Sequence, residues 1–374
     1  MRIALFSGNY NYLREGANQA LNILVRYLEE KADCSVRVYS PVTATPAFDP
    51  EGTLVPVPSI PLPVRSEFRL ALGLPRAIRD DIRGFRPNIV HVSTPDILGV
   101  RAQTFAKKLG IPVVASMHTR FETYLAYYGL GWAQPTLEAH LNRFYKRSDH
   151  VVAPTVALVD DLRALRGDDR VSVWGRGVDA ERFHPDKRDM NWRRSLGIAD
   201  DEIVILFLGR LVLEKGISTF AATVSELQRR KFPVRPLVVG AGPAAQAFEG
   251  LAGTIFTGHL SGLTLATAIA SADVMLSPST TETFGNVILE AMACGLPIVS
   301  VDAQNTRSIL TDGEDGIICA GADARAYIDA LVKLSENPTL RRAMGDAARR
   351  KSLGNSWDTE SAKVEQVYRT LVGR

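Results

Sequence analysis

Two glutamates, Glu282 and Glu290, lie eight positions apart in the stretch SPSTTETFGNVILEAMACGLP, residues 277–297. The apolar run 274–276 just before this stretch is typical of a strand, and apolar residues at helical spacing follow it. The first glutamate is therefore expected in a loop and the second one turn inside a helix. The alternative is structural, with Glu282 capping the helix and Glu290 solvated on its surface.

The start of this helix has the features of an anion site. Residues 279–281, all serine or threonine, are expected to form the loop and cap the helix. The first-turn backbone N–H groups, at Phe284, Gly285 and Asn286, carry partial positive charge that favours a phosphate. A phosphate between two carboxylates that accept from hydroxyls indicates a sugar nucleotide, with one carboxylate on the sugar and the other on the ribose.

A second group of polar residues follows the apolar run 203–208. Arg210 and Lys215 lie five positions apart between Gly209 and Gly216. A guanidinium fork and an ammonium point charge, with glycines that allow close backbone approach, suit a diphosphate. The alternative, a solvated basic loop, fits less well after a wholly apolar strand.

Two glycine turns at other strand ends carry weaker signals. Gly240 lies in the turn VGAGP, and Gly258, His259 and Leu260 close the expected strand 254–256. The backbone of this second turn could contact a nucleobase edge, and a plain tight turn is the alternative reading.

The first half of the chain has fewer residues suited to chemistry. His118 follows the apolar run 113–116 and could contact a sugar or an acceptor hydroxyl, although lone histidines are more often structural. The loop before Gly16 lacks the spaced glycines of a dinucleotide fingerprint, which argues against an NAD enzyme. An aromatic cluster is either an interfacial patch that meets lipid or, as is commoner at this density, the edge of a packed core. It consists of Phe121, Tyr124, Tyr127, Tyr128 and Trp132.

Length and composition indicate a soluble enzyme of two domains. The chain has 374 residues, about twice a typical domain, with 46% hydrophobic and 23% charged residues. Three widely spaced cysteines favour a reduced cytosolic compartment. The N-terminal apolar run is too short for a signal peptide, and no segment reaches the roughly 18 apolar residues of a membrane span.

Charge is unevenly distributed along the chain. The formal net charge is +3, yet residues 1–176 hold 22 lysines and arginines against 17 aspartates and glutamates, and the remainder holds 22 against 24. A basic first half favours an anionic partner such as lipid headgroups. The alternative is an ordinary solvated surface, and the basic residues are too sparse to predict nucleic-acid binding.

Strand-like and helical patterns alternate throughout, which predicts parallel sheets with crossover helices. Strands are expected at residues 3–6, 36–39, 89–92, 113–116, 151–153, 203–208, 235–239, 254–256, 274–276 and 298–301. Helices are expected at 18–30, 69–83, 101–109, 136–147 and 356–371, with the proline-rich segment 55–64 as an extended surface connection. The stretch WGRGVDAERFHP, 174–185, is the expected domain boundary.

Together the motifs resemble the retaining glycosyltransferases of the GT4 group, which have the GT-B architecture. The likeness runs through nearly the whole chain and is most specific in TETFGNVILEAMACGLPIV, GRLVLEKG and SMHTRFETYLAYYG. The last tract and WGRGVDAERFHP are similar to the branch of sulfoquinovosyl-diacylglycerol synthases and GDP-mannose-dependent α-mannosyltransferases. The resemblance implies two Rossmann-like, doubly wound α/β domains facing across a cleft. Residues 1–176 would bind the acceptor and 177–355 the nucleotide sugar, and the segment 356–374 is a candidate to pack back on the first domain.

The resemblance also implies roles for the second half. Arg210 and Lys215 would hold the donor diphosphate, Glu282 the sugar hydroxyls and Glu290 the ribose. The backbone of residues 284–286 would contact sugar and phosphate.

In the first half, the resemblance places His118 beside the sugar and Gly16 near the donor phosphate. Many relatives carry paired glycines at this second position, where the chain has REGAN.

The implied reaction transfers a sugar to an acceptor hydroxyl with retention at the anomeric carbon. The leaving phosphate takes the acceptor's proton, so catalysis rests on positioning and on electrostatic stabilisation. No Asp-x-Asp sequence occurs and the histidines are scattered, so neither a metal nor another cofactor is expected.

The expected donor is a UDP-sugar, with GDP-mannose open, and the expected acceptor is a membrane lipid such as diacylglycerol or a glycolipid. We expect a cytoplasmic protein with peripheral contact to the inner face of an anionic cytoplasmic membrane. An acceptor in polysaccharide assembly, a sugar-nucleotide 2-epimerase and a non-catalytic nucleotide-binding module remain alternatives.

Overall fold

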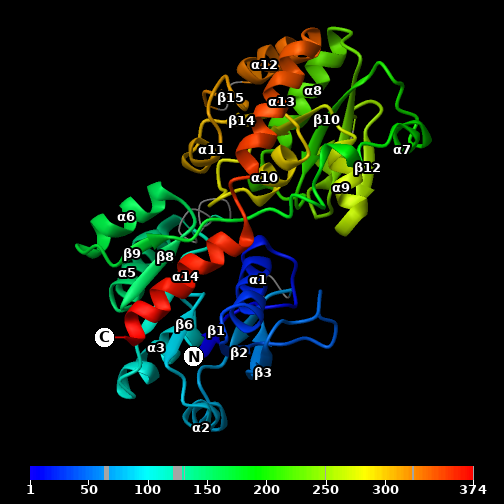
Figure 1. Cartoon of the computed structure of the whole chain (residues 1–374). Coiled ribbons are helices and arrows are strands. Elements are labelled where there is room, and N and C mark those ends of the chain that lie inside the picture. The colour runs from blue at the N-terminus through cyan, green and yellow to red at the C-terminus, as the bar shows by residue number, and fades with distance from the viewer. Residues whose placement is uncertain (63–66, 121–128, 130, 249, 322–323, 374) are drawn as a thin grey trace. The chain divides into compact units, whose positions relative to one another are not determined.

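The computed structural model describes residues 1–62, 67–120, 129, 131–248, 250–321 and 324–373. The chain forms two compact units: unit 1 contains Met1–Arg176 and Trp357–Arg374, and unit 2 contains Gly177–Ser356. Each unit is built around one parallel sheet with helices on both faces (Figure 1).

The sheet of unit 1 has seven parallel strands in the order β3-β2-β1-β6-β7-β8-β9. Their bounds are β1 Arg2–Phe6, β2 Ser35–Ser40, β3 Thr53–Pro56, β6 Ile89–Val92, β7 Val113–Ser116, β8 His150–Ala153 and β9 Val171–Val173. Central strands such as β6 and β7 are buried along their whole length, because helices cover both faces of a parallel sheet.

The helices of unit 1 divide between the two faces of this sheet. One face packs against α2 (Arg76–Phe85), α3 (Ile97–Lys108), α5 (Gln134–Lys146) and α6 (Val156–Arg166). The other packs against α1 (Gly16–Glu30) and α14 (Trp357–Val372). In Figure 1 the last helix, red, runs beside the first, blue.

Two expectations for unit 1 are wrong. The helix expected at 69–83 begins only at Arg76, because Pro75 restricts the residue before it to extended backbone and itself forms the N-cap. The residues before it form β5 (Arg69–Ala71), antiparallel to β4 (Ser59–Pro61). The segment 55–64 is therefore partly strand, since its first residues also belong to β3.

The sheet of unit 2 has six parallel strands in the order β12-β11-β10-β13-β14-β15. Their bounds are β10 Ile203–Leu208, β11 Val234–Val239, β12 Ile255–Gly258, β13 Val274–Ser277, β14 Ile298–Val301 and β15 Gly316–Cys319. One face packs against α9 (Gly262–Ala270) and α10 (Asn286–Ala293), and the other against α8 (Ile217–Arg229) and α12 (Ala324–Glu336). The remaining helices are α7 (Met190–Ser195), α11 (Gln304–Ile309) and α13 (Pro338–Ser352).

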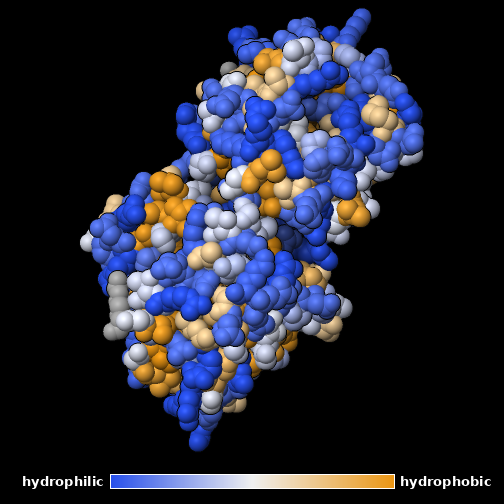
Figure 2. All heavy atoms as spheres, viewed as in Figure 1, coloured by the Kyte–Doolittle hydropathy of each residue, from blue (hydrophilic) through white to orange (hydrophobic). Residues whose placement is uncertain are grey.

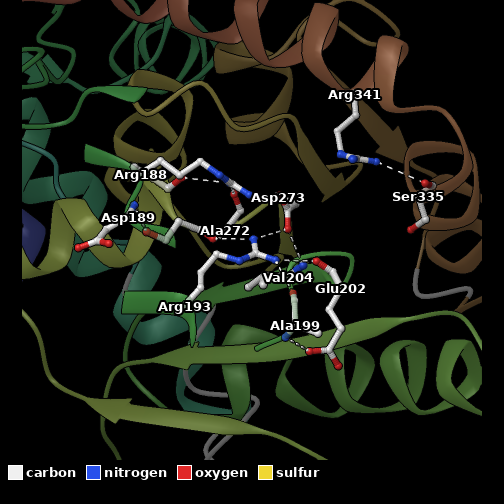
Figure 3. Close-up of polar contacts among 12 residues, drawn as sticks. Arg188, Asp189, Arg193, Ala199, Glu202, Val204, Ala272, Asp273, Ser335 and Arg341 are labelled. Atoms are coloured by element: carbon white, nitrogen blue, oxygen red, sulfur yellow. Dashed lines mark hydrogen bonds and ion pairs between the residues drawn. The ribbon is translucent and has the colours of Figure 1, made fainter. Parts of the chain in front are cut away.

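A buried charge cluster holds α7 against the amino ends of β10 and β13 (Figure 3). The guanidinium of Arg193, 1% exposed, donates to one carboxylate oxygen of Asp273 at 2.8 Å and to backbone carbonyls. The other oxygen accepts from Arg188 at 2.7 Å. Asp273 also accepts from the backbone N–H of Val204, so the cluster anchors the end of the sheet away from the strands' carboxyl ends.

No helix within the described part of the chain combines the length and apolar character needed to cross a bilayer.

Candidate functional site

Two loops meet at the carboxyl ends of the neighbouring strands β10 and β13. The loop after β10 contains a short 3₁₀ helix, Leu213–Lys215, that ends at Gly216 in the left-handed region (φ 72°). A Cβ at this glycine would lie 2.7 Å from the carbonyl oxygen of Pro278 in the loop after β13. The absence of a side chain at Gly216 thus lets the two loops pack backbone against backbone.

The hydroxyls of the second loop strengthen this packing. Ser279 Oγ and Thr281 Oγ1 donate to the Glu214 carbonyl oxygen at 3.3 and 3.2 Å. The expected capping of α10 by these residues is therefore wrong, because their hydroxyls point to the other loop. The N-cap is instead Gly285 (φ 103°), with no side-chain capping bond.

The packed loops bring together two residues that are 67 positions apart. Lys215 Nζ donates to Glu282 Oε1, and each side chain is about a fifth exposed (21% and 20%). A small pocket beside them is lined by both residues, by Ser277 to Ser279 and by Val287 in the first turn of α10. The predicted diphosphate-binding lysine, the predicted sugar-binding glutamate and the start of α10 thus share one pocket.

Glu290 lies on the second turn of α10 and is partly buried. Burial raises the pKa of its carboxyl to about 7, and the positive charge of Arg182 opposes the shift only weakly. A carboxylate with so little compensation is costly unless a ligand donates to it.

Five further predicted donor-site residues lie at neighbouring strand ends. Gly240 (φ 146°) packs so closely that a Cβ would lie 1.9 Å from the Gly209 carbonyl oxygen, and its N–H donates to Gly258. His259 and Arg210 are exposed, and Leu260 packs partly buried against the core.

In unit 1, His118 is 9% exposed and follows β7. Its Nε2 lies 2.8 Å from Ser116 Oγ, and its Nδ1 accepts from Arg176 Nη2 at 3.0 Å. Gly16 is the exposed first residue of α1, with Glu15 as N-cap. These two predicted residues lie in the other unit from Lys215 and Glu282.

The expectation of a packed core edge is wrong at Trp132, which is 81% exposed, because it lies on a one-turn 3₁₀ helix, Gly131–Ala133, that has no buried residue. The other four aromatic residues of the cluster lie outside the described part of the chain.

Sequence reasoning missed the partners of His118. Arg176 lies in the predicted domain boundary and Ser116 ends a predicted strand, so neither pattern marks them as site residues. The sequence signal that could identify Arg176 is an arginine between two glycines and two positions after Trp174.

Two family models match the chain. The model "Glycosyltransferase Family 4" covers residues 14–182, and "Glycosyl transferases group 1" covers residues 189–351.

Curated relatives span most of the chain. The sulfoquinovosyl transferase SQD2 of Arabidopsis thaliana is 29% identical over 97% of this chain and 72% of its own length. A GDP-mannose-dependent alpha-mannosyltransferase of Mycolicibacterium smegmatis is 32% identical over 85% of this chain and 82% of its own length. An alpha-monoglucosyldiacylglycerol synthase of Acholeplasma laidlawii is 25% identical over 100% of this chain and 98% of its own length.

A solved structure shares the fold over both units. Sucrose-phosphate synthase from Thermosynechococcus elongatus matches with a TM-score of 0.80 at 19% identity, over 100% of this chain and 99% of that one. With its two Rossmann-like sheets, the chain belongs to the family 4 group of glycosyltransferases, with the GT-B fold.

Proposed function

We propose that the protein transfers a sugar from a UDP-sugar to a hydroxyl of a membrane lipid, with retention at the anomeric carbon and without a metal ion. The proposed binding of the sugar donor is supported by the pocket that Lys215, Glu282 and the start of α10 share. It supports a site that takes an anion and a sugar side by side. Binding of nucleotide-sugar donors is a property of this enzyme family.

The donor diphosphate would be stabilised by cations and amide groups. Lys215 and Arg210 supply positive charge, and the backbone N–H groups at the start of α10 supply the helix dipole. The leaving diphosphate gains negative charge in the transition state, so these groups stabilise the transition state more than the bound donor.

The ion pair of Lys215 and Glu282 keeps both side chains in place. A bound diphosphate would draw the ammonium away, and the carboxylate would then accept from the hydroxyls of the sugar. Phosphate and sugar recognition are thereby coupled in one contact.

Three observations support a lipid acceptor. The relative from Acholeplasma laidlawii, named for a product built on diacylglycerol, matches the whole chain. Residues 1–176 carry the excess of basic residues. Unit 1 also exposes apolar side chains, with Trp132 81% and Val156 61% exposed, and apolar spheres gather over α6 in Figure 2.

One experiment separates donor from acceptor questions. The full chain is incubated with UDP-glucose, UDP-glucuronic acid or GDP-mannose and a membrane lipid extract, and products are scored by mass spectrometry. We expect a lipid that gains one hexose-type unit, and the anomer of the product, by NMR, to match that of the donor. Modification of an oligosaccharide but of no lipid would overturn the lipid acceptor and leave the transferase.

Lys215→Ala tests the donor site in the same assay. Loss of one stabilising charge should lower turnover by roughly 10²–10³-fold at saturating donor. The matched control is Lys333→Ala on α12, away from the pocket, which should retain turnover. Near-normal turnover of the Lys215 variant would contradict the proposed site.

GDP-mannose is the second candidate donor, because the relative that shows the family most clearly is named for it. Turnover with GDP-mannose alone would replace the UDP-sugar in the proposal. An isomerised sugar nucleotide formed without acceptor would support the epimerase alternative instead.

A further inference from the structure

A continuous chain of side-chain hydrogen bonds crosses the sheet of unit 1, from α14 to the residue after β7. Tyr368 Oη contacts His91 Nδ1, and His91 Nε2 lies 2.8 Å from Ser116 Oγ. Ser116 Oγ lies 2.8 Å from His118 Nε2, and Arg176 closes the chain on His118 Nδ1 at 3.0 Å. All five side chains are buried, at 9% exposure or less.

The arginine sets the direction of the hydrogen bonds at His118. A guanidinium can only donate, so His118 Nδ1 accepts and its neutral ring carries the proton on Nε2. That N–H donates to Ser116 Oγ, which also lies within hydrogen-bond distance of His91 Nε2. His91 joins Ser116 to Tyr368 through its two ring nitrogens.

The surroundings keep both imidazoles neutral. The edge of Trp174 packs against both rings, with centroids 5.3 Å from His118 and 6.2 Å from His91. Burial lowers the pKa of His91 to about 3 and that of His118 well below its usual value. Neither ring is suited to take up a proton near neutral pH.

Helix α14 contacts the hydrogen-bond chain at both of its ends. Tyr368, on α14, is the last member of the hydrogen-bond chain on one side of the sheet. Two turns earlier, the carboxylate of Glu360 accepts from the N–H of Gly175 at 2.7 Å, beside the buried guanidinium of Arg176. A Cβ at Gly175 would lie 2.9 Å from that carboxylate, so helix and strand end are in close contact.

We propose that this hydrogen-bond chain positions His118, the second residue after β7, for sugar transfer, and that Tyr368 is a positioning residue 250 positions away from it. The inference rests on the proposed function and on the place beside the donor sugar that the family resemblance implies for His118. Both ring nitrogens of His118 are engaged within the protein, so the residue does not act as a general acid or base. Its role is positional, and the hydrogen-bond chain from α14 holds its ring in place.

The tautomer of His118 can be tested without an activity assay. The full chain, labelled with ¹⁵N in its six histidines, is studied at pH 7 by long-range ¹H–¹⁵N correlation. His118→Gln and His91→Gln assign the two ring signals. We expect His118 to be protonated on Nε2 only. A proton on His118 Nδ1 would contradict the proposed hydrogen-bond chain, in which this nitrogen accepts from Arg176.

The positioning role is tested by Tyr368→Phe, which removes one hydroxyl and leaves the ring. Since small misplacements of reacting groups cost large factors in rate, we expect turnover to fall about tenfold. Donor KM and affinity for free UDP should not change, because the predicted diphosphate contacts lie in unit 2. Ser116→Ala removes the hydroxyl in the middle of the hydrogen-bond chain and should lower turnover by the same factor.

Tyr327→Phe is the matched control. Tyr327 is 1% exposed, its hydroxyl donates to a backbone carbonyl at 3.2 Å, and it lies in unit 2. Equal turnover for the Tyr327 and Tyr368 variants would overturn the positioning role. If Tyr368→Phe does not fold, Ser116→Ala decides by the same comparison. If the wild-type protein transfers no sugar, the proposed function and the positioning role are both wrong. The tautomer of His118 is tested independently, by the NMR experiment.

Discussion

At the scale of single residues, three charged side chains of unit 2 have their charges compensated to different degrees. Lys215 and Glu282 neutralise each other, whereas Glu290 is partly buried with only a weak counter-charge. The first arrangement is stable without a ligand, and the second is one that a ligand improves. Each leads to a measurable expectation.

Glu282→Gln should bind free nucleoside diphosphate more tightly than the wild type. The ammonium of Lys215 no longer has to leave a carboxylate, and the negative charge that repels the diphosphate is gone. For a pair of this exposure the gain is about 1 kcal/mol, or roughly fivefold in Kd. Calorimetry with UDP and GDP measures it.

The same variant should lose most of its sugar transfer, because an amide is a weaker acceptor for sugar hydroxyls. Glu314→Gln, in an exposed turn, is the control and should leave both quantities unchanged. Weaker binding of both diphosphates by Glu282→Gln would show that the ion pair assists binding and does not compete with it.

Glu290→Gln should stabilise unit 2 above pH 7 and have little effect below pH 4.5. The folded-state pKa is raised to about 7 from 4.5, so between these values the folded state binds more protons than the unfolded state. Stability of the wild type therefore falls as pH rises through this window, and the variant lacks that fall. Urea denaturation at pH 4.5, 6 and 8 tests the expectation, and a stability difference independent of pH would contradict it.

At the scale of elements, the site depends on how closely the loops after β10 and β13 approach. The alternation of strand and helix predicts these strands, and the carboxyl ends of neighbouring parallel strands lie at the same sheet edge, so both loops are expected there. Contacts within the loops were not predictable. A hydroxyl next to a helix start is usually a cap, and only the tertiary approach of the Glu214 carbonyl redirects Ser279 and Thr281.

Gly216→Ala tests this approach, with Gly197→Ala as its control. Both glycines have nearly the same left-handed backbone, φ 72° and 73°, but a Cβ at the second meets nothing within 4 Å. Both variants bear the cost of an alanine at positive φ, so their difference isolates the loop contact. We expect lower thermal stability and lower donor turnover for Gly216→Ala. Equal behaviour of the two variants would show that the loops do not need this contact.

Edge elements were the least predictable part of the fold. The sequence pattern does not predict the short strands β9 and β15, because each has only a few apolar residues and lies at a sheet edge. The hydrogen-bond chain of unit 1 was equally hidden, since His91, Ser116 and Tyr368 come from distant parts of the sequence. Side chains at such separations meet only through the sheet order and the return of α14.

At the scale of the whole molecule, the uneven charge leads to an expectation about membranes. If basic residues of 1–176 attract anionic lipid, the protein should sediment with vesicles that contain phosphatidylglycerol but not with pure phosphatidylcholine. Binding should fall steeply between 0.05 and roughly 0.5 M salt, because salt screens charges beyond a few ångströms. Equal binding to both vesicle types would contradict the electrostatic contact.

The return of α14 has a consequence for synthesis. Unit 1 is interrupted by the whole of unit 2, and its last helix covers a sheet face that includes Trp174 and the buried His91. At ~5–20 residues per second, this helix leaves the ribosome on the order of ten seconds or more after Arg176. During that interval the nascent first unit exposes an apolar surface, while unit 2, which is continuous in sequence, can already fold. We therefore expect ribosome-associated chaperones to bind the nascent polypeptide until α14 has been synthesised.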